Sequence, residues 1–163
     1  MFSRDDFVNF VRRIYKTDLS ISLHEPRFGQ LEKDLVLDCI ESTFVSSVGK
    51  YVDQFESAIE EFTGAEQAVA VVNGTQALFI ALKLAGAKEK TEVITQSLTF
   101  VATANAITYT GAHADFVDVE TDTLGMSPDS LKDFLNANTT IKNGVCINIQ
   151  TENQIVACVP MHT

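Results

Sequence analysis

Four consecutive residues that follow an apolar run could together hold an anion. The run is Ala68–Val72, and the four residues are Asn73, Gly74, Thr75 and Gln76. If a helix begins here, its first backbone N–H groups have no partner inside the helix, and the helix dipole favours negative charge. Gly74 would let a ligand come close to the backbone, and Thr75 would add a hydroxyl donor. The chemistry would be phosphate binding by the N–H groups of Thr75 and Gln76 and by the Thr75 hydroxyl.

The same four residues also fit an ordinary turn into a capped helix, and their spacing does not decide between the two. A Gly-Thr pair is much less specific than the Walker A pattern, and neither GxxxxGK[ST] nor GxGxxG occurs in the chain. A second polar group, Gln96-Ser97-Leu98-Thr99, follows the next apolar run and leads to Phe100. The Phe100 ring could stack on a planar cofactor, or Phe100 could be a core residue.

A third group follows the apolar run that ends near Val119. Asp118, Asp122 and Thr123 could make polar contacts beside a ligand, but we favour the alternative that Asp118 caps the loop after the strand. His162 could touch a ligand as well, although a lone histidine is more often neither ligand nor base. The sequence shows no Ser/His/Asp set, no metal-ligand spacing and no basic aromatic patch, so it predicts neither a catalytic residue nor a metal site.

Strands that alternate with helices must position these groups. Three helices, with apolar residues at helical spacing, are expected before Gly64, and Ser3 would cap the first of them. Five strands and three helices are predicted after Gly64. The strands are Gln67–Val72, Glu92–Thr95 and Ala114–Val119, and then Val145–Ile149 and Gln154–Pro160 after a turn at Asn143-Gly144. The helices are Thr75–Leu84, with Ala77, Ile80, Ala81 and Leu84 on one face, Thr99–Tyr109, and one capped by Ser127 with Pro128 at its first position. This order predicts an α/β fold with a mostly parallel sheet, helices on both faces, and ligands at the carboxyl ends of the strands.

Composition narrows the class of protein. The 163 residues are 45% hydrophobic and 21% charged, and the net charge of −10 argues against non-specific binding to nucleic acid or to an anionic membrane. Three scattered cysteines without a CxxC pair fit reduced thiols. There is no signal-peptide pattern and no apolar run near the roughly 20 residues that span a bilayer, so a cytoplasmic location is expected.

Several stretches, taken together, resemble the DegT/DnrJ/StrS family of pyridoxal-phosphate-dependent sugar aminotransferases. They are VAVVNGTQALFIAL, EVITQSLTFVATANAITYTGAHADFVDVETDTLGMSP and VPMHT. Within that family, LHEPRFG and STFVSSVGKYVDQFE are similar to LegC-type enzymes. Those enzymes aminate C4 of a UDP-linked 4-keto-6-deoxy-N-acetylhexosamine on the route to legionaminic and related nonulosonic acids.

The resemblance covers residues 23–163 and implies a three-layer, aspartate-aminotransferase-like large domain of fold type I in a homodimer. Residues 1–64 would be N-terminal helices packed on that domain, and residues 65–163 would be its first part. Pyridoxal 5′-phosphate would be the cofactor. Its phosphate would lie at Gly74, Thr75 and Gln76, and its ring against Phe100. The residues implied to contact the sugar substrate are Pro26, Arg27 and Phe28.

The implied reaction moves an amino group from an amino acid such as glutamate to the C4 keto group of the sugar nucleotide. Family members are longer, and their Schiff-base lysine lies beyond the position that corresponds to residue 163. We therefore expect a truncated chain that is inactive by itself, and we nominate none of its lysines as the nucleophile. Two alternatives remain: a non-catalytic remnant, and a dehydratase of the same family that uses pyridoxamine phosphate.

Overall fold

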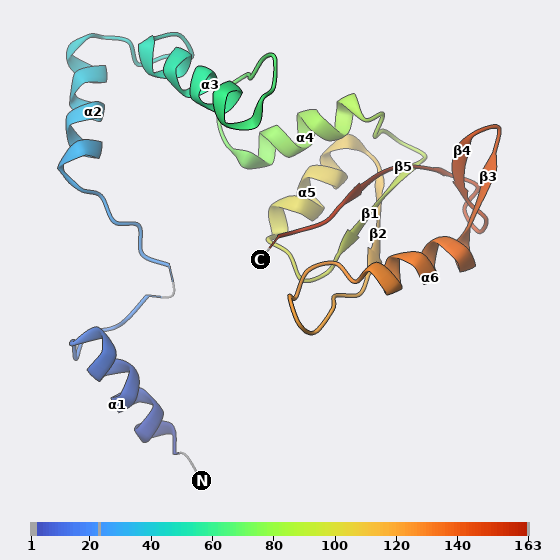
Figure 1. Ribbon diagram of the computed structural model, residues 1–163, viewed down its shortest axis with the longest axis horizontal. Helices are drawn as coiled ribbons and strands as arrows, with labels where there is room; N and C mark the ends of the chain where they lie inside the picture. The colour runs from blue at the N-terminus through green and yellow to red at the C-terminus, as the bar shows by residue number, and fades with distance from the viewer. Residues whose placement is uncertain (1–2, 23, 163) are drawn as a thin grey trace. The chain divides into compact units, whose positions relative to one another are not determined.

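A computed structural model describes residues 3–22 and 24–162 (Figure 1). The chain divides into two compact units, residues 1–55 and residues 56–163. The first unit contains α1 (Arg4–Tyr15), α2 (Gln30–Glu41) and the beginning of α3 (Lys50–Thr63). Ser3 caps α1 by accepting from the Asp6 N–H at 3.1 Å, as its position predicts. Asp38 joins α2 to α3, since its carboxylate lies 2.7 Å from Lys50 Nζ and accepts from the Tyr51 hydroxyl at 2.9 Å.

The second unit is built on a five-stranded sheet with the strand order β2-β1-β5-β4-β3. Its strands are β1 (Thr91–Gln96), β2 (His113–Val117), β3 (Thr139–Lys142), β4 (Val145–Asn148) and β5 (Gln154–Val159), and its helices are α4 (Gly74–Leu84), α5 (Val101–Thr110) and α6 (Pro128–Asn138). β1 runs parallel to β2 and β5, whereas β4 runs antiparallel to β3 and β5. The predicted α/β fold is confirmed, with a mixed rather than a mostly parallel sheet.

β1 is the centre of this unit because every one of its six residues is buried. Val93 packs in a core with Leu82 of α4 and with Ala106 and Ile107 of α5, so α4 and α5 cover one face of the sheet. α6 crosses the other face from β2 to β3 (Figure 1). Ser127 caps α6 and Pro128 occupies its first position, as predicted.

The face of α4 that packs is not the predicted one. Leu82 is buried, with Leu78 and Phe79 against the same core, whereas the predicted face is exposed: 42% of Ile80 and 85% of Leu84. Apolar residues surround most of α4, so their spacing does not distinguish the side that meets the sheet.

The predicted strand Gln67–Val72 is absent from the described sheet, and this prediction was wrong. No strand of the described sheet pairs with this segment. Two of its backbone N–H groups donate to glutamate side chains of α3 instead. The Ala68 N–H donates to Glu60 Oε1 at 2.9 Å, and the Ala70 N–H donates to Glu56 Oε1 at 2.7 Å. An apolar run predicts an extended backbone, but it does not show which group will accept its hydrogen bonds.

A short strand, β3, was missed by the sequence pattern. It pairs with β4 through a hairpin turn at Asn143-Gly144, where φ is +52° and +79°. This Asn-Gly pair was predicted as a turn, and two successive positive φ angles are typical of the tight turns that join antiparallel strands. β3 was missed because its four residues follow α6 without a break in sequence pattern.

Candidate functional site

The first turn of α4 is a capped helix N-terminus that faces outward. Asn73, in an extended conformation, accepts from the Gln76 N–H through its side-chain Oδ1 at 3.0 Å. The Ala77 N–H donates to the Asn73 carbonyl at 3.1 Å. The N–H groups of Gly74 and Thr75 have no acceptor within the helix. Two backbone N–H groups were predicted to donate to a phosphate. The Thr75 N–H is available for this, whereas the Gln76 N–H already donates to the capping Asn73 side chain.

Neither steric contact nor backbone conformation in the folded chain requires a glycine at position 74. A Cβ at this position would find no heavy atom within 4 Å, and its φ does not lie in the left-handed region. The space beside Gly74 is therefore open to a ligand at the point where the helix N–H groups point outward. Thr75 and Gln76, which follow Gly74 in the first turn, are half-buried.

Phe100 is a surface residue. It occupies the N-cap position of α5, with φ −65° and ψ 138°, and 77% of it is exposed. The alternative that Phe100 belongs to the core is therefore wrong. Leu98 and Val101 beside it are also exposed, at 47% and 60%. An exposed aromatic ring with apolar neighbours offers a surface on which a planar ligand can stack.

The topology brings the first turn of α4 and Phe100 to the same edge of the sheet. α4 runs toward the start of β1, so its N-terminus lies at the carboxyl end of that strand, and a connection of four residues joins the end of β1 to α5. α4 and α5 pack against each other, and in Figure 1 both helices begin at the left of the sheet, the side on which β5 ends. The carboxyl edge of parallel strands is where α/β proteins bind ligands.

Gln96 was given no role by the sequence pattern, but it connects the loops of this edge. The side chain is fully buried, and its amide donates to the carbonyls of Leu98 and Leu124 at 3.0 and 3.2 Å. Its Oε1 accepts from the Met161 N–H at 3.1 Å. The available signal was an amide side chain at the end of the apolar run Val-Ile-Thr-Gln, where burial requires hydrogen-bond partners.

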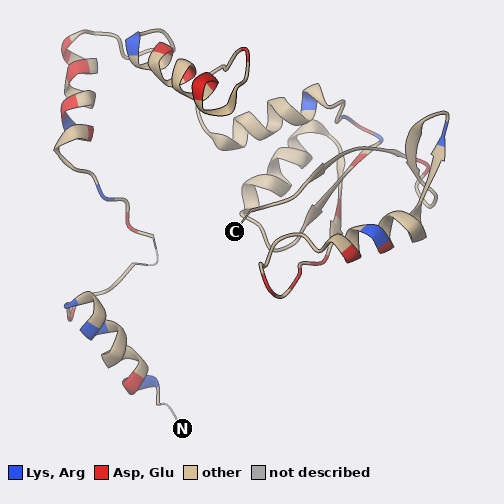
Figure 2. Cartoon of the chain, viewed as in Figure 1, with Lys and Arg blue, Asp and Glu red and all other residues tan. Residues whose placement is uncertain are grey.

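The loop after β2 behaves as the favoured alternative predicts. Asp118 is exposed, and its Oδ1 accepts from the adjacent Val119 N–H at 2.8 Å, while its carbonyl accepts from the Ser127 N–H at 2.9 Å. Acidic residues gather in this loop before α6 (Figure 2). Residues 73–76, 97–100, 118–127 and 160–162 contain no lysine or arginine, so an anion here would depend on N–H and hydroxyl donors.

A second polar cluster lies at the opposite, amino edge of the sheet. Glu92 is completely buried and accepts from Asn148 Nδ2 at 2.8 Å, Thr151 Oγ1 at 2.5 Å and Asn153 Nδ2 at 3.1 Å. Burial opposes its charge, but these bonds outweigh burial and lower the pKa of Glu92. Asp115 has the opposite response: burial first, and then the neighbouring Glu92, raise its pKa to about 6. This cluster joins the β4–β5 turn to β1 and is structural.

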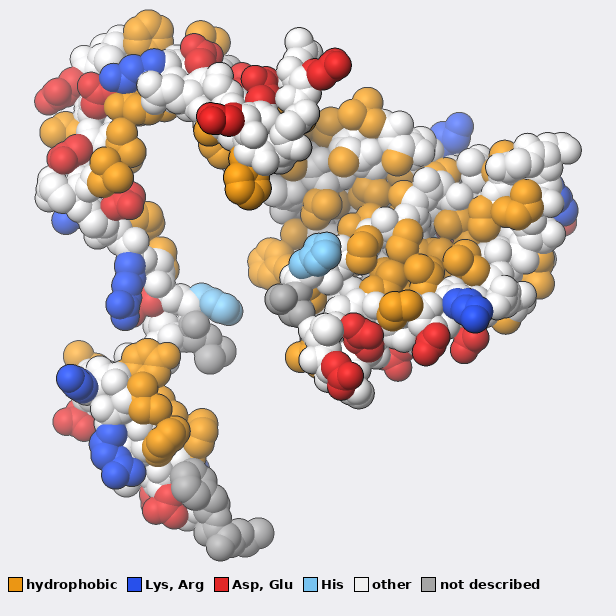
Figure 3. Space-filling view, viewed as in Figure 1, with side chains coloured by type: hydrophobic (Ala, Val, Ile, Leu, Met, Phe, Trp, Pro, Cys, Tyr) orange, Lys and Arg blue, Asp and Glu red, His pale blue; other side chains and the backbone are white. Residues whose placement is uncertain are grey.

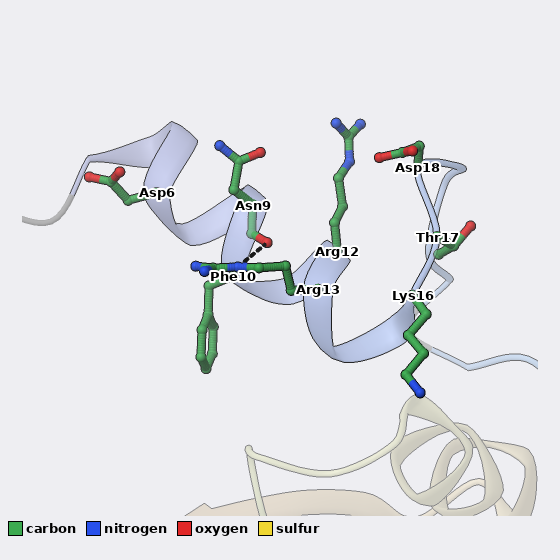
Figure 4. Close-up of a pocket in the computed structure, with 8 residues that line it drawn as sticks. All are labelled: Asp6, Asn9, Phe10, Arg12, Arg13, Lys16, Thr17 and Asp18. Atoms are coloured by element: carbon green, nitrogen blue, oxygen red, sulfur yellow. Dashed lines mark hydrogen bonds between the residues drawn. The ribbon is translucent and has the colours of Figure 1, made fainter.

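The hollow along α1 is not a ligand site. It has a volume of about 1220 Å³ and is lined only by residues of α1 and the turn after it. The lining side chains do not converge: Phe10 and Arg12 point to opposite sides of the helix (Figure 4). Across residues 3–22 and 24–162 no three His, Cys, Asp or Glu side chains are grouped to hold a metal ion. None of the helices described is long and apolar enough to cross a membrane.

A model of the DegT/DnrJ/EryC1/StrS aminotransferase family matches residues 26–150, which include the first turn of α4 and Phe100. The chain belongs to this family. GDP-perosamine synthase of Caulobacter vibrioides is 39% identical over 119 residues, which are 73% of this chain and 32% of that protein. The crystal structure of a DegT DnrJ EryC1 StrS aminotransferase from Brucella abortus matches with a TM-score of 0.63 and 30% identity over 78% of this chain and 32% of that one.

This member of the DegT/DnrJ/EryC1/StrS family spans about a third of the length of the curated relatives that it matches. The cofactor of the family is pyridoxal phosphate. Spr1654 of Streptococcus pneumoniae, solved in its PLP form, shares the fold at a TM-score of 0.60 and 25% identity over 71% of this chain and 29% of that one. The residues present fit this cofactor chemically: open N–H donors beside Gly74 suit a phosphate, and the exposed Phe100 ring suits a pyridine.

The residues implied to contact the sugar lie in the other unit of this aminotransferase-family chain. Pro26, Arg27 and Phe28 form part of the exposed connection between α1 and α2, and Phe28 is 69% exposed. Phe28 borders an apolar groove of about 510 Å³ with Val36 and Ile40 of α2. The structure places these three residues next to one another on a surface, and their role toward the sugar stays a prediction.

Proposed function

We propose that residues 73–76 and Phe100 form the phosphate and ring contacts of a pyridoxal-phosphate site in a nucleotide-sugar aminotransferase. The observation that carries the proposal is the position of Gly74: the chain has no steric need for glycine there, and the space beside it lies at the helix N-terminus that shares an edge with Phe100. Thr75 would donate its N–H and hydroxyl to the phosphate. Gln76 would add its N–H if Asn73 releases it.

When bound, pyridoxal phosphate supplies the electron sink that lets an amino group move between an amino acid and a keto sugar. The chain's own contribution is to bind and orient. The first turn of α4 would fix one end of the cofactor, and Phe100 would cover one side of its ring and exclude water there. No lysine lies in residues 97–100, 118–127 or 160–162, which supports the proposal that residues 1–163 alone do not carry out the transfer.

For the substrate we propose a sugar nucleotide with a keto group at C4, aminated with glutamate as donor. The LegC-like stretches favour a UDP-linked 4-keto-6-deoxy-N-acetylhexosamine, on a route to nonulosonic acids or surface glycans. The similarity to GDP-perosamine synthase favours a GDP-linked sugar as the competing choice. Dehydration of the sugar is the alternative within the family, and nothing in the described residues favours it. We further propose a cytoplasmic homodimer, with residues 1–64 as helices that pack on a large domain begun by residues 65–163.

Ligand binding to the chain itself tests the site. Calorimetric titrations would compare pyridoxamine 5′-phosphate, pyridoxamine and inorganic phosphate, because the amine forms do not react with surface lysines. We expect pyridoxamine 5′-phosphate to bind most tightly and pyridoxamine without phosphate to bind least. Equal binding of pyridoxamine with and without its phosphate would refute the proposed phosphate contacts.

Two matched threonine substitutions locate the site on α4. Thr75→Val removes one hydroxyl donor from the proposed contacts and should weaken both phosphate ligands roughly tenfold, as expected for one hydrogen bond to a charged group. Thr108→Val is the control, because the Thr108 hydroxyl only donates to the Ala104 carbonyl within α5, at 2.9 Å. A loss of phosphate binding in both variants would show that the effect is not local to α4.

A further inference from the structure

The Gln96 side chain joins three chain segments that are far apart in the sequence. Its two N–H groups donate to Leu98, in the segment that leads to Phe100, and to Leu124, in the loop between β2 and α6. Its oxygen accepts from Met161, in the segment after β5. The amide therefore uses both donors and one acceptor position inside a fully buried environment, where an unpaired group would be costly.

The loop between β2 and α6 meets Gln96 at a residue with an unfavourable backbone conformation. Leu124 has a φ of +59°, a left-handed conformation that a leucine adopts at a cost in free energy. Its carbonyl is the group that Gln96 holds. The same loop comes close to the segment after β5, since a Cβ on Gly125 would lie 3.8 Å from the Met161 carbonyl oxygen. Gln96 lies where these segments converge.

Gln96 also contacts the short segment that leads to Phe100. Residues 97–100 are held at their start by the bond from Gln96 to the Leu98 carbonyl. They are held at their end by α5, where the Thr99 and Thr103 hydroxyls lie 2.9 Å apart and the Thr103 N–H donates to the Phe100 carbonyl at 3.0 Å. The Thr99 N–H donates to the Ser97 carbonyl at 3.1 Å within the segment, so the bond from Gln96 is the contact that joins this segment to the loop at Leu124 and the segment at Met161.

We propose that Gln96 is a positioning residue for the cofactor site. Its buried amide sets the position of the Phe100 ring relative to the loop at Leu124 and the segment at Met161. The inference rests on the proposed function, because a fixed ring position matters only if a planar ligand stacks there. Glutamate would turn an oxygen toward both carbonyls, and methionine would fill the space with no hydrogen bond, so an amide is needed.

Amide hydrogen exchange tests the contact without any ligand. In Gln96→Met, the Met161 N–H loses its acceptor and should exchange roughly tenfold faster, with faster exchange at Thr99 and Leu124 as their segments loosen. In Gln96→Glu, Met161 should keep its protection while Thr99 and Leu124 lose theirs. Thr95→Val is the control: it removes a buried bond of 2.8 Å to the Val159 carbonyl on the other face of β1 and should leave Thr99 and Leu124 unchanged.

Ligand binding tests the positioning of Phe100. Gln96→Met should weaken pyridoxamine 5′-phosphate binding roughly tenfold and leave inorganic phosphate binding unchanged, because the phosphate contacts on α4 do not depend on Gln96. A merely structural role would weaken both ligands together. The proposal is overturned if both ligands, or neither, lose affinity, or if Thr95→Val reproduces the selective loss.

The two measurements separate failure of this inference from failure of the proposed function. If the wild-type chain binds neither ligand, the proposed function is wrong, and hydrogen exchange still decides whether Gln96 holds the three segments. If Gln96→Met does not unfold cooperatively, Gln96→Glu carries the test, because its carboxylate still accepts from Met161. Unchanged exchange at Thr99 and Leu124 in a folded variant would overturn the inference.

Discussion

A substitution at Gly74 should affect phosphate binding without lowering the stability of the fold. Gly74→Ala places a Cβ in open space at the first position of α4. Because alanine favours a helix and restricts the unfolded chain, we expect the free energy of unfolding to stay the same or rise by up to about 1 kcal/mol. Phosphate affinity should fall at least roughly tenfold, since the methyl group lies where a ligand would approach the backbone.

Urea unfolding and phosphate titration measure the two effects of Gly74→Ala side by side. Gly86→Ala is the matched control, because Gly86 has a φ of +96° that alanine rarely adopts. It should lower stability and leave phosphate binding to the folded protein unchanged. If Gly74→Ala binds phosphate as the wild type does, the proposed contact is wrong.

Asp115 should make the protein less stable as the pH rises. Burial and Glu92 raise its pKa from 3.8 to about 6, although His113 acts in the opposite direction, and its Oδ2 is buried without a hydrogen-bond partner. Between these two pKa values the folded protein binds a proton that the unfolded chain has released, so stability falls through this window and is constant above it. Asp115→Asn removes this loss and should stabilise the protein by about 1–2 kcal/mol near pH 8, with no gain near pH 4.

Chemical unfolding of both proteins over this pH range measures the difference. Glu92, whose pKa is lowered, stabilises the fold above its unfolded pKa and loses this effect as the pH falls, so its pH dependence is opposite in sign to that of Asp115. Asp133→Asn, an exposed aspartate on α6, is the control for loss of one negative charge. A gain that does not depend on pH would contradict the assignment to Asp115.

Among the elements, α3 supplies to residues 68–70 the hydrogen-bond acceptors that a neighbouring strand would supply in a sheet. Glu56 and Glu60 lie one helical turn apart and accept the N–H groups of Ala70 and Ala68. Glu56→Ala should leave the Ala70 N–H without its acceptor and lower the free energy of unfolding by about 1–2 kcal/mol. Glu61→Ala, an exposed position on the same helix, should change it by less than about 0.5 kcal/mol. Equal effects in urea unfolding would show that the contact at Ala70 does not stabilise the fold.

The elements also show how far the sequence predicts this fold. Helix caps and tight turns were predicted well, as at Ser3, Ser127 and Asn143-Gly144, because they depend on neighbouring residues. The error at Gln67–Val72 and the wrong face of α4 share a cause: both depend on distant partners. The same holds for the candidate site. The helix start at Gly74 could be predicted because it depends on neighbouring residues, whereas the contacts of Gln96 could not, because its partners Leu124 and Met161 are distant in the sequence.

On the scale of the whole molecule, the unit of residues 56–163 has two polar edges with different tasks. Glu92 joins the β4–β5 turn to β1 at the amino edge, and Gln96 joins three loops at the carboxyl edge. Both are buried polar residues of the same strand. Apolar side chains gather on the face of this unit seen in Figure 3. The exposed apolar residues of the unit include Val72, Leu84 and Phe100. A surface of this kind favours association with other protein segments.

The helices of the first unit have a consequence for cleavage by proteases. Neither α1 nor α2 buries a single residue, and the connection between them is exposed along most of its length. Segments of this kind open locally at little cost in free energy, and proteases cut such segments first. Brief digestion with trypsin should therefore cut at Lys16, Arg27 or Lys33 before it cuts at Lys83 or Lys132. Mass spectrometry should then find a resistant fragment that contains residues 56–163, with the sheet and both ends of β1 intact; early cleavage at Lys83 would contradict this order.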